Sequence, residues 1–137
     1  MPALAWWKGK IKAGSTSDQL AITLDVFPTM LGIADLPARK VAFDGIDLSP
    51  FLRQQQEPTD RTLFWAYGNQ MAMRAGTWKL LRGIDDSGAT GLFNLADASD
   101  ETVDLSTRNP EKAAAMLARM TAWRAETLQD ATPQPDN

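Results

Sequence analysis

The sequence contains no cysteine and no histidine. Without cysteine there can be no disulfide, no thiolate metal site and no cysteine nucleophile. Without histidine the chain lacks the commonest general base and the commonest ligand of transition metals. A Ser-His-Asp triad is therefore excluded, and a zinc site would need carboxylates alone, which is an unfavourable ligand set.

Long apolar runs and positive charge are also scarce. No run approaches the ~20 apolar residues that a membrane span requires. The net charge is -3, whereas a general nucleic-acid binder needs clustered positive charge. Lys8, Lys10 and Lys12 form the one local basic cluster, and we interpret it as a solvated loop face. The sequence leaves the cellular compartment open.

The residues that are present predict a globular domain. The hydrophobic fraction is 44%, with five Trp and five Phe among 137 residues, which is enough to bury a core. The first apolar run, Ala3 to Trp7, is typical of a buried strand. A strand of this kind normally lies between neighbours, and the chain offers no obvious ones nearby. This is a hint that the sequence is a piece of a larger protein.

Two helices are predicted in the first part of the chain. Apolar residues recur at helical spacing from Leu24 to Ala34. Pro28 must then lie in the first turn, where its missing N–H is not needed, so the helix begins near residues 23 to 25. Ser49 followed by Pro50 matches an N-cap and a first helical residue, which predicts a short second helix.

A meander of strands is predicted next. Four short apolar segments are separated by turn residues, and Gly76 and Gly88 supply the positive φ that tight turns need. Consecutive short strands with short turns predict an antiparallel sheet. The four segments are Leu63–Tyr67, Met71–Arg74, Trp78–Arg82 and Leu92–Leu95.

The final part predicts a helix that covers this sheet. Asn109 is suited to the N-cap and Pro110 to the first helical position, and the helix should run to about Leu128. An antiparallel sheet with one dry face needs such a cover. The fold class is therefore α+β, with about four strands under a C-terminal helix. The apolar stripe of that helix comprises Ala113, Met116, Leu117, Met120 and Trp123.

No catalytic motif emerges from the residues themselves. The sequence has neither a G-x-x-x-x-G-K-[ST] nor a G-x-G-x-x-G loop. Its acidic segments do not match the spacing of a calcium-binding EF-hand loop, so turn and capping roles are predicted for them. These acids are Asp85, Asp86, Asp97, Asp100, Glu101 and Asp104.

The order of the segments, however, resembles the C-terminal part of type I sulfatases. The pieces that carry the resemblance are PALAWWKGKIKAGSTSDQ, LAITLDVFPTMLGIAD, DGIDLSPFL, RTLFWAYGNQMAMRAGTWKLL and GLFNLADASDETVDL. They are similar to family patterns such as D-x-x-P-T, D-G-x-[DS]-L and A-x-R-x-G-x-W-K, and they span Pro2 to about Glu126. Lys8 departs from the pattern, which usually has proline there.

The resemblance implies a division of the chain and an absence of catalytic parts. Residues 1–48 resemble the end of the sulfatase α/β domain, residues 49–128 form the C-terminal sheet and helix, and residues 129–137 are a frayed tail. The formylglycine nucleophile and the calcium of the family belong to a catalytic domain that this sequence does not contain. The chain alone is expected to hold no cofactor and to be inactive.

The resemblance also directs attention to the turn after the first strand. Tyr67, Asn69 and Gln70 are predicted to face the substrate, because a turn beside the catalytic cleft can shape the substrate pocket. The expected partner is the sulfatase catalytic domain or a second copy of the chain, in a dimer or larger species. Two other functions stay open. They are a free-standing interaction module, and the same portion of a phosphonate or phosphate monoester hydrolase of the alkaline phosphatase superfamily.

Overall fold

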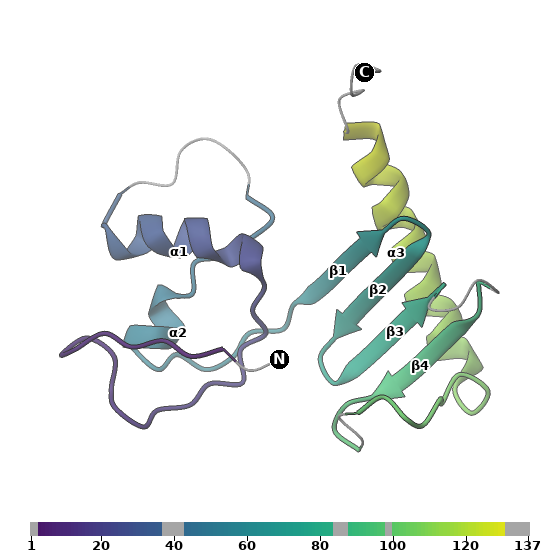
Figure 1. The fold of residues 1–137 in the computed structure, drawn as a ribbon, viewed down its shortest axis with the longest axis horizontal. Coiled ribbons are helices and arrows are strands. Elements are labelled where there is room, and N and C mark those ends of the chain that lie inside the picture. Colours follow the sequence, from purple (N-terminus) through teal and green to yellow (C-terminus); the bar gives the residue numbers. More distant parts are fainter. Residues whose placement is uncertain (1–2, 37–42, 84–87, 98–99, 131–137) are drawn as a thin grey trace. The chain divides into compact units, whose positions relative to one another are not determined.

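A computed structural model describes residues 3–36, 43–83, 88–97 and 100–130 of the chain (Figure 1). They belong to two compact units, Met1–Asp60 and Arg61–Asn137. The predicted division after residue 48 falls inside the first unit. The predicted frayed tail lies outside the described residues from residue 131 onward.

The first unit contains three short helical elements. A 3-10 turn, η1 (Thr23–Asp25), leads into helix α1 (Val26–Ile33), and α2 follows at Ser49–Arg53. Pro28 lies in the first turn of α1, as predicted. The start of α2 differs by one residue from the prediction, because Leu48 is the N-cap and Ser49 already belongs to the helix. Helix boundaries commonly shift by this amount.

The predicted strand at Ala3–Trp7 is wrong. These residues form no ladder with any part of the chain that the structure describes. Leu4 is 94% exposed and Trp6 is 79% exposed. A strand exists only where another strand accepts and donates its backbone hydrogen bonds. Ala3–Trp7 is therefore apolar enough for a strand, but no strand among the described residues pairs with it.

The second unit is the predicted antiparallel meander. Its strands are β1 (Thr62–Tyr67), β2 (Gln70–Ala75), β3 (Trp78–Arg82) and β4 (Thr90–Asn94). They pair in the order β1-β2-β3-β4, each antiparallel to the next. Helix α3 (Pro110–Asp130) follows and lies along one face of the sheet (Figure 1). The α+β fold class is confirmed.

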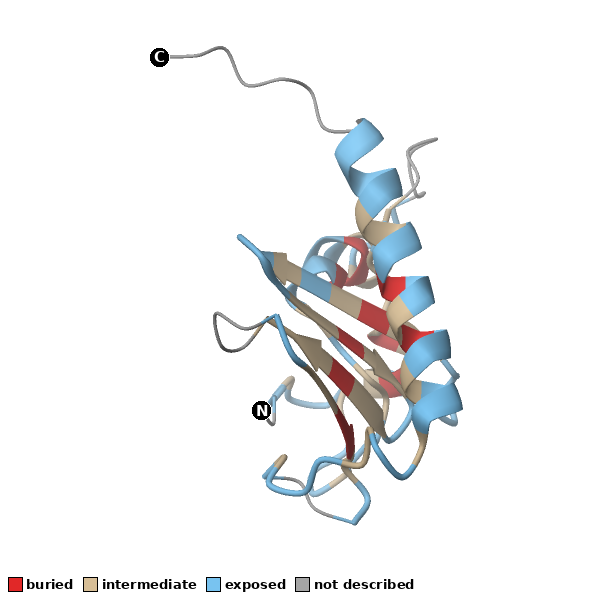
Figure 2. Cartoon of the chain, turned by 90° about the vertical axis from the view of Figure 1, so that its right-hand side faces the viewer, coloured by how far each residue is buried: buried red, intermediate tan, exposed pale blue. Residues whose placement is uncertain are grey.

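The core of the second unit lies between this face and α3. The register places Met73 opposite Phe64 and Leu80, and Leu80 opposite Leu92, so these side chains share the helix-facing side. Figure 2 shows the buried residues of the sheet and of α3 facing each other. The buried apolar cluster comprises Met73, Leu80, Leu92, Met116 and Met120.

The rest of the apolar stripe on α3 also contacts the sheet. Ala113 and Leu117 pack against the buried cluster. The Trp123 ring stacks on Phe64, with the ring centroids 5.0 Å apart and the planes 9° from parallel. The predicted covering role of α3 is thus confirmed. None of the helices in the described ranges is long and apolar enough to cross a membrane.

Candidate functional site

The turn between β1 and β2 brings the three predicted site residues together. Tyr67 ends β1 and pairs with Gln70, which begins β2, so that Gly68 and Asn69 form a two-residue connection. Gly68 has a φ of 56°, the left-handed value that such hairpin turns require. Tyr67 is 86% exposed, and the side chains of Asn69 and Gln70 are also exposed. The turn is therefore accessible to a ligand.

The backbone of this turn is held against the end of β3. Gly83 follows β3 with a φ of 72°. A Cβ at this position would lie 2.8 Å from the carbonyl oxygen of Asn69, a distance that real Cβ atoms do not reach. Only glycine permits this approach. The Asn69 backbone of the turn thus lies close to Gly83.

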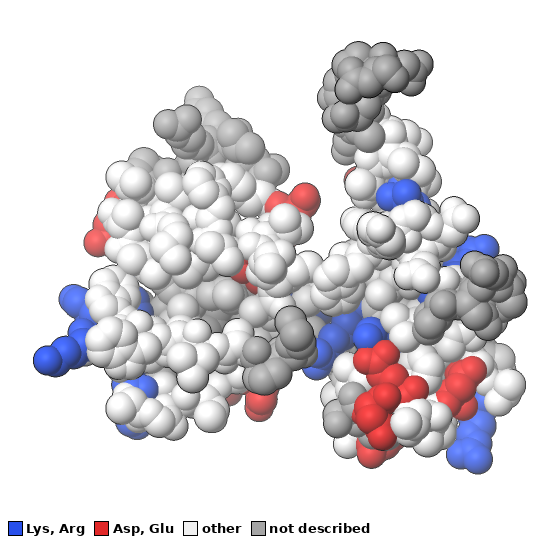
Figure 3. Space-filling view, viewed as in Figure 1, with Lys and Arg blue, Asp and Glu red and all other residues white. Residues whose placement is uncertain are grey.

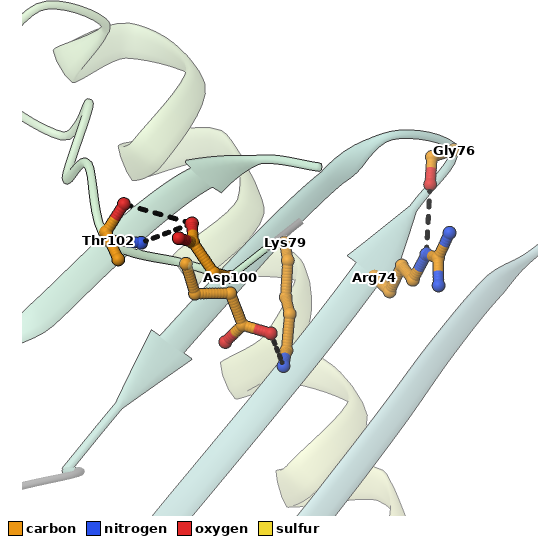
Figure 4. A network of polar contacts seen from close by, with 6 residues as sticks. Arg74, Gly76, Lys79, Asp100 and Thr102 are labelled. Carbon is orange, nitrogen blue, oxygen red and sulfur yellow. Dashed lines mark hydrogen bonds and ion pairs between the residues drawn. The ribbon is translucent and has the colours of Figure 1, made fainter. Parts of the chain in front are cut away.

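Arg74 and Lys79, two of the cations on the hairpin between β2 and β3, have structural partners. They face each other across these strands. The Lys79 ammonium pairs with Glu101 at 2.6 Å, and the Arg74 Nε donates to the Gly76 carbonyl at 3.2 Å. Figure 4 shows these contacts on the sheet surface. They connect β3 to the segment after β4 and close the β2–β3 turn.

Several acidic residues after β4 form turn and capping hydrogen bonds, as predicted, whereas Glu101 pairs with Lys79. Asp97 accepts a hydrogen bond from the Asn94 side chain at 2.7 Å. Asp104 accepts from the Leu92 N–H at 3.0 Å and from the Ser106 N–H at 2.8 Å. Donation by Leu92, followed by donation from Ser106, lowers the pKa of Asp104 below its ordinary value. Asp85 and Asp86 lie outside the described residues.

The described residues do not fit the calcium that the family resemblance implies. No group of three or more acidic side chains in these ranges could hold a metal ion. The oxygens of Asp104 and Asp97 already accept hydrogen bonds from the protein. The expectation that the chain binds no cofactor stays a prediction.

A buried polar network in the first unit was missed by the sequence analysis. Asp25 is fully buried, and its two carboxylate oxygens accept hydrogen bonds from the Ile22 N–H at 2.7 Å and the Ile46 N–H at 2.9 Å. The Thr29 hydroxyl donates to the Asp25 carbonyl at 2.6 Å and accepts from the Leu48 N–H at 2.9 Å. Asp25 and Thr29 of the D-x-x-P-T segment therefore hold the D-G-x-D-L segment, residues 44–48, in place. The presence of both sequence patterns in the chain could have indicated this role.

Two glycines and a serine complete this network. Gly45 lies against the carbonyl of Leu24, and Gly32 lies against the carboxylate of Asp47, so a Cβ at either position would collide. Asp47 accepts from the Ser49 N–H at 2.7 Å and from the Ser49 hydroxyl at 2.9 Å. Ser49 is 8% exposed. It therefore fixes the start of α2 and is not presented as a nucleophile.

Comparison with known proteins identifies the source of these patterns. No family model matches the chain. Arylsulfatase G of Mus musculus is 33% identical over 95% of this chain and 29% of its own length. N-acetylgalactosamine-6-sulfatase of Sus scrofa is 44% identical over 57% of this chain and 15% of its own length. The chain thus spans less than a third of these relatives.

Solved structures share the fold. Ps i-CgsB matches with a TM-score of 0.69 and 22% identity, over 85% of this chain and 27% of that one. BT4656, solved in complex with its substrate D-glucosamine-2-N,6-O-disulfate, matches with a TM-score of 0.68 and 16% identity, over 92% of this chain and 28% of that one. The two curated relatives are sulfatases. These similarities support the identification of the chain as a C-terminal portion of a sulfatase.

Proposed function

We propose that this chain serves as the C-terminal, non-catalytic portion of a sulfatase, a sulfuric ester hydrolase. The observation that carries the proposal is the alignment of 95% of the chain with 29% of arylsulfatase G. Cleavage of a sulfate ester needs a potent nucleophile and preorganised positive charge. The Ser49 hydroxyl donates a hydrogen bond to Asp47, and the Lys79 ammonium forms an ion pair with Glu101. The nucleophile and the calcium of the family would therefore come from a catalytic portion outside this sequence.

The first unit supplies a surface for that catalytic portion. Helix α1 carries three apolar side chains that are more than half exposed, Val26, Phe27 and Met30. Leu4 and Trp6, in the segment that lacks a strand partner, are exposed as well. Apolar surface of this kind marks an interaction site. We assign it to the sulfatase catalytic portion, and we expect the chain by itself to associate into dimers or larger species.

The turn at Tyr67, Asn69 and Gln70 supplies substrate selectivity. Its side chains carry a phenol and two amides, which donate hydrogen bonds to the oxygens of a sulfated ligand. They are exposed, and the backbone of Asn69 lies close to Gly83.

A nitrophenyl sulfate assay, with and without calcium, tests the non-catalytic role. The purified chain should show no turnover above background. Turnover that co-purifies with the chain and disappears after substitution of one of its residues would reveal an active site within it.

The selectivity role is tested in the full-length protein. The double variant Asn69→Ala, Gln70→Ala should raise KM for a sulfated sugar and leave turnover of nitrophenyl sulfate unchanged. Gln54→Ala, Gln56→Ala, which removes two exposed amides of the first unit, is the matched control. Unchanged kinetics with the sulfated sugar would remove the turn from the substrate site.

A free-standing interaction module is the second candidate function. One observation favours it: the second unit has a buried core of its own. In this case the chain would remain a monomer without a catalytic portion, and light scattering distinguishes the two functions.

A further inference from the structure

The turn after Trp7 presents three lysines from a fixed loop. The carbonyl of Trp7 accepts hydrogen bonds from the Lys10 N–H at 3.1 Å and from the Ile11 N–H at 3.0 Å. Gly9, in the middle of the turn, has a φ of 73°. The lysines at positions 8, 10 and 12 are all exposed. We call residues 8 to 12 the basic turn.

A fourth cation lies beside the basic turn. The Arg53 guanidinium is located 5.8 Å from the centroid of the Trp7 ring, within the range of a cation–π contact. Arg53 ends helix α2 and is exposed. Trp7 itself is half-buried, so it joins the basic turn to α2. Figure 3 shows Lys and Arg side chains gathered over this N-terminal segment of the first unit.

No acidic neighbour neutralises this charge. The sequence has no Asp or Glu before Asp18. Within the described ranges, Lys8, Lys10 and Lys12 form no ion pair. The basic turn is therefore a local positive patch in a chain whose net charge is -3.

We propose that the basic turn and Arg53 form a docking site for a sulfated polysaccharide. The proposal rests on the proposed function, because a sulfatase that acts on a polymer meets many sulfate groups on one chain. Sulfate esters stay ionised at all physiological pH values, and lysine ammonium groups bind such anions as point charges. A polyanion gains further from the release of its condensed counterions. Three lysines on one turn, with Arg53 of α2 beside them, match a linear polymer better than a single small ester.

Binding of fluorescent dextran sulfate to the chain, titrated at several salt concentrations, tests the proposal. The triple variant Lys8→Gln, Lys10→Gln, Lys12→Gln keeps most of each side chain and removes three charges. Its affinity should fall at least about tenfold, and the slope of log K against log salt should drop by roughly two to three. Arg53→Gln should give a smaller loss in the same direction.

A matched control removes three charges from the second unit, through Arg108→Gln, Lys112→Gln and Arg124→Gln. This variant should bind dextran sulfate within about twofold of the unchanged chain. Equal losses in the two triple variants would overturn the proposal, because they would show a response to net charge alone. Equal binding of unsulfated dextran would overturn it as well.

Other polyanions separate the sources of binding. Tighter binding of single-stranded RNA or of phosphatidylserine vesicles, abolished by the same three lysine substitutions, would also overturn the assignment to a sulfated glycan. The assay involves no hydrolysis. A failure here therefore leaves the sulfatase role untouched, and absence of sulfatase activity in the full-length protein leaves the binding result untouched.

Discussion

Among the residues that the structure describes, four apolar side chains of the second unit are fully buried, Met73, Leu80, Leu92 and Met120, whereas the fully buried side chain of the first unit is Asp25. The second unit excludes apolar surface from water through a sheet and a covering helix. The first unit satisfies buried backbone N–H groups with carboxylate and hydroxyl oxygens, and it leaves the apolar residues of α1 exposed. The second unit therefore has an apolar core of its own, and we propose that a partner completes the first.

The largest expected effect is in the second unit. Leu80→Ala removes a fully buried side chain from the centre of the sheet, and large-to-small changes of this type cost roughly 3 to 4 kcal/mol. Urea unfolding followed through Trp78 and Trp123 fluorescence measures the loss. Leu128→Ala, at a site that is 56% exposed, is the control and should change the free energy of unfolding by less than about 0.5 kcal/mol. An equal loss of unfolding free energy in the two variants would show that Leu80 does not belong to the core of the second unit.

The second prediction concerns the polar network of the first unit. Asp25→Ala leaves the N–H groups of Ile22 and Ile46 without their carboxylate, which costs about 2 to 3 kcal/mol locally. Hydrogen exchange at these two amides should accelerate, while exchange in β2 and β3 stays unchanged. Asp18→Ala, an exposed acid of the same unit, serves as the control. Acceleration throughout the second unit would mean that the two units unfold together.

A smaller loss is expected at the edge of the core. Trp123→Ala removes the ring that stacks on Phe64. The cost should be about 2 kcal/mol, below that of a fully buried aromatic, because Trp123 is only half-buried. Thermal unfolding measures it. A shift of only a degree or so would show that the stacked ring adds no stability.

The smallest effect is a pH dependence at Asp104. Its pKa is lower in the folded chain, chiefly because the Leu92 N–H donates to the carboxylate. The charged form therefore stabilises the fold above the unfolded-state pKa of about 3.9, and this stabilisation is lost as the pH falls through the lower folded-state value. Solvent screening keeps the effect small, since the side chain is exposed.

Asp104→Asn tests this pH dependence. Its free energy of unfolding should be lower than that of the unchanged chain at pH 7, and the two should converge as the pH falls through the folded-state pKa of Asp104. A constant difference across the acid range would assign the effect to geometry rather than charge.

The second unit could be predicted from the sequence because its information is local. Apolar segments separated by glycine turns predicted the four strands. The Asn109-Pro110 pair and the apolar stripe through Met116 and Met120 predicted the covering helix. Each of these patterns marks apolar side chains that are buried against neighbouring strands or the helix of the same unit. The predicted bounds differ from the observed ones by one or two residues at the strand ends.

The first unit resisted prediction because its structure depends on distant partners. The apolar run Ala3–Trp7 predicted a strand, but strand formation requires a second strand, and the described residues of the unit supply none. The hydrogen bond from the Ile46 N–H to Asp25 joins residues 21 positions apart, which no local periodicity shows. The accessible turn at Tyr67, Asn69 and Gln70 was placed correctly in the fold, whereas its contact with substrate remains a prediction.

Hydrogen exchange of the whole chain, read amide by amide, tests the central difference between the two units most directly. Exchange free energies for amides in β2 and β3 should exceed those in α1 by at least about 2 kcal/mol, because only the sheet is covered by an apolar core of its own. Addition of the sulfatase catalytic portion should then protect α1 and leave β2 and β3 unchanged. Equal protection of both units in the isolated chain, with no response of α1 to the catalytic portion, would contradict the account.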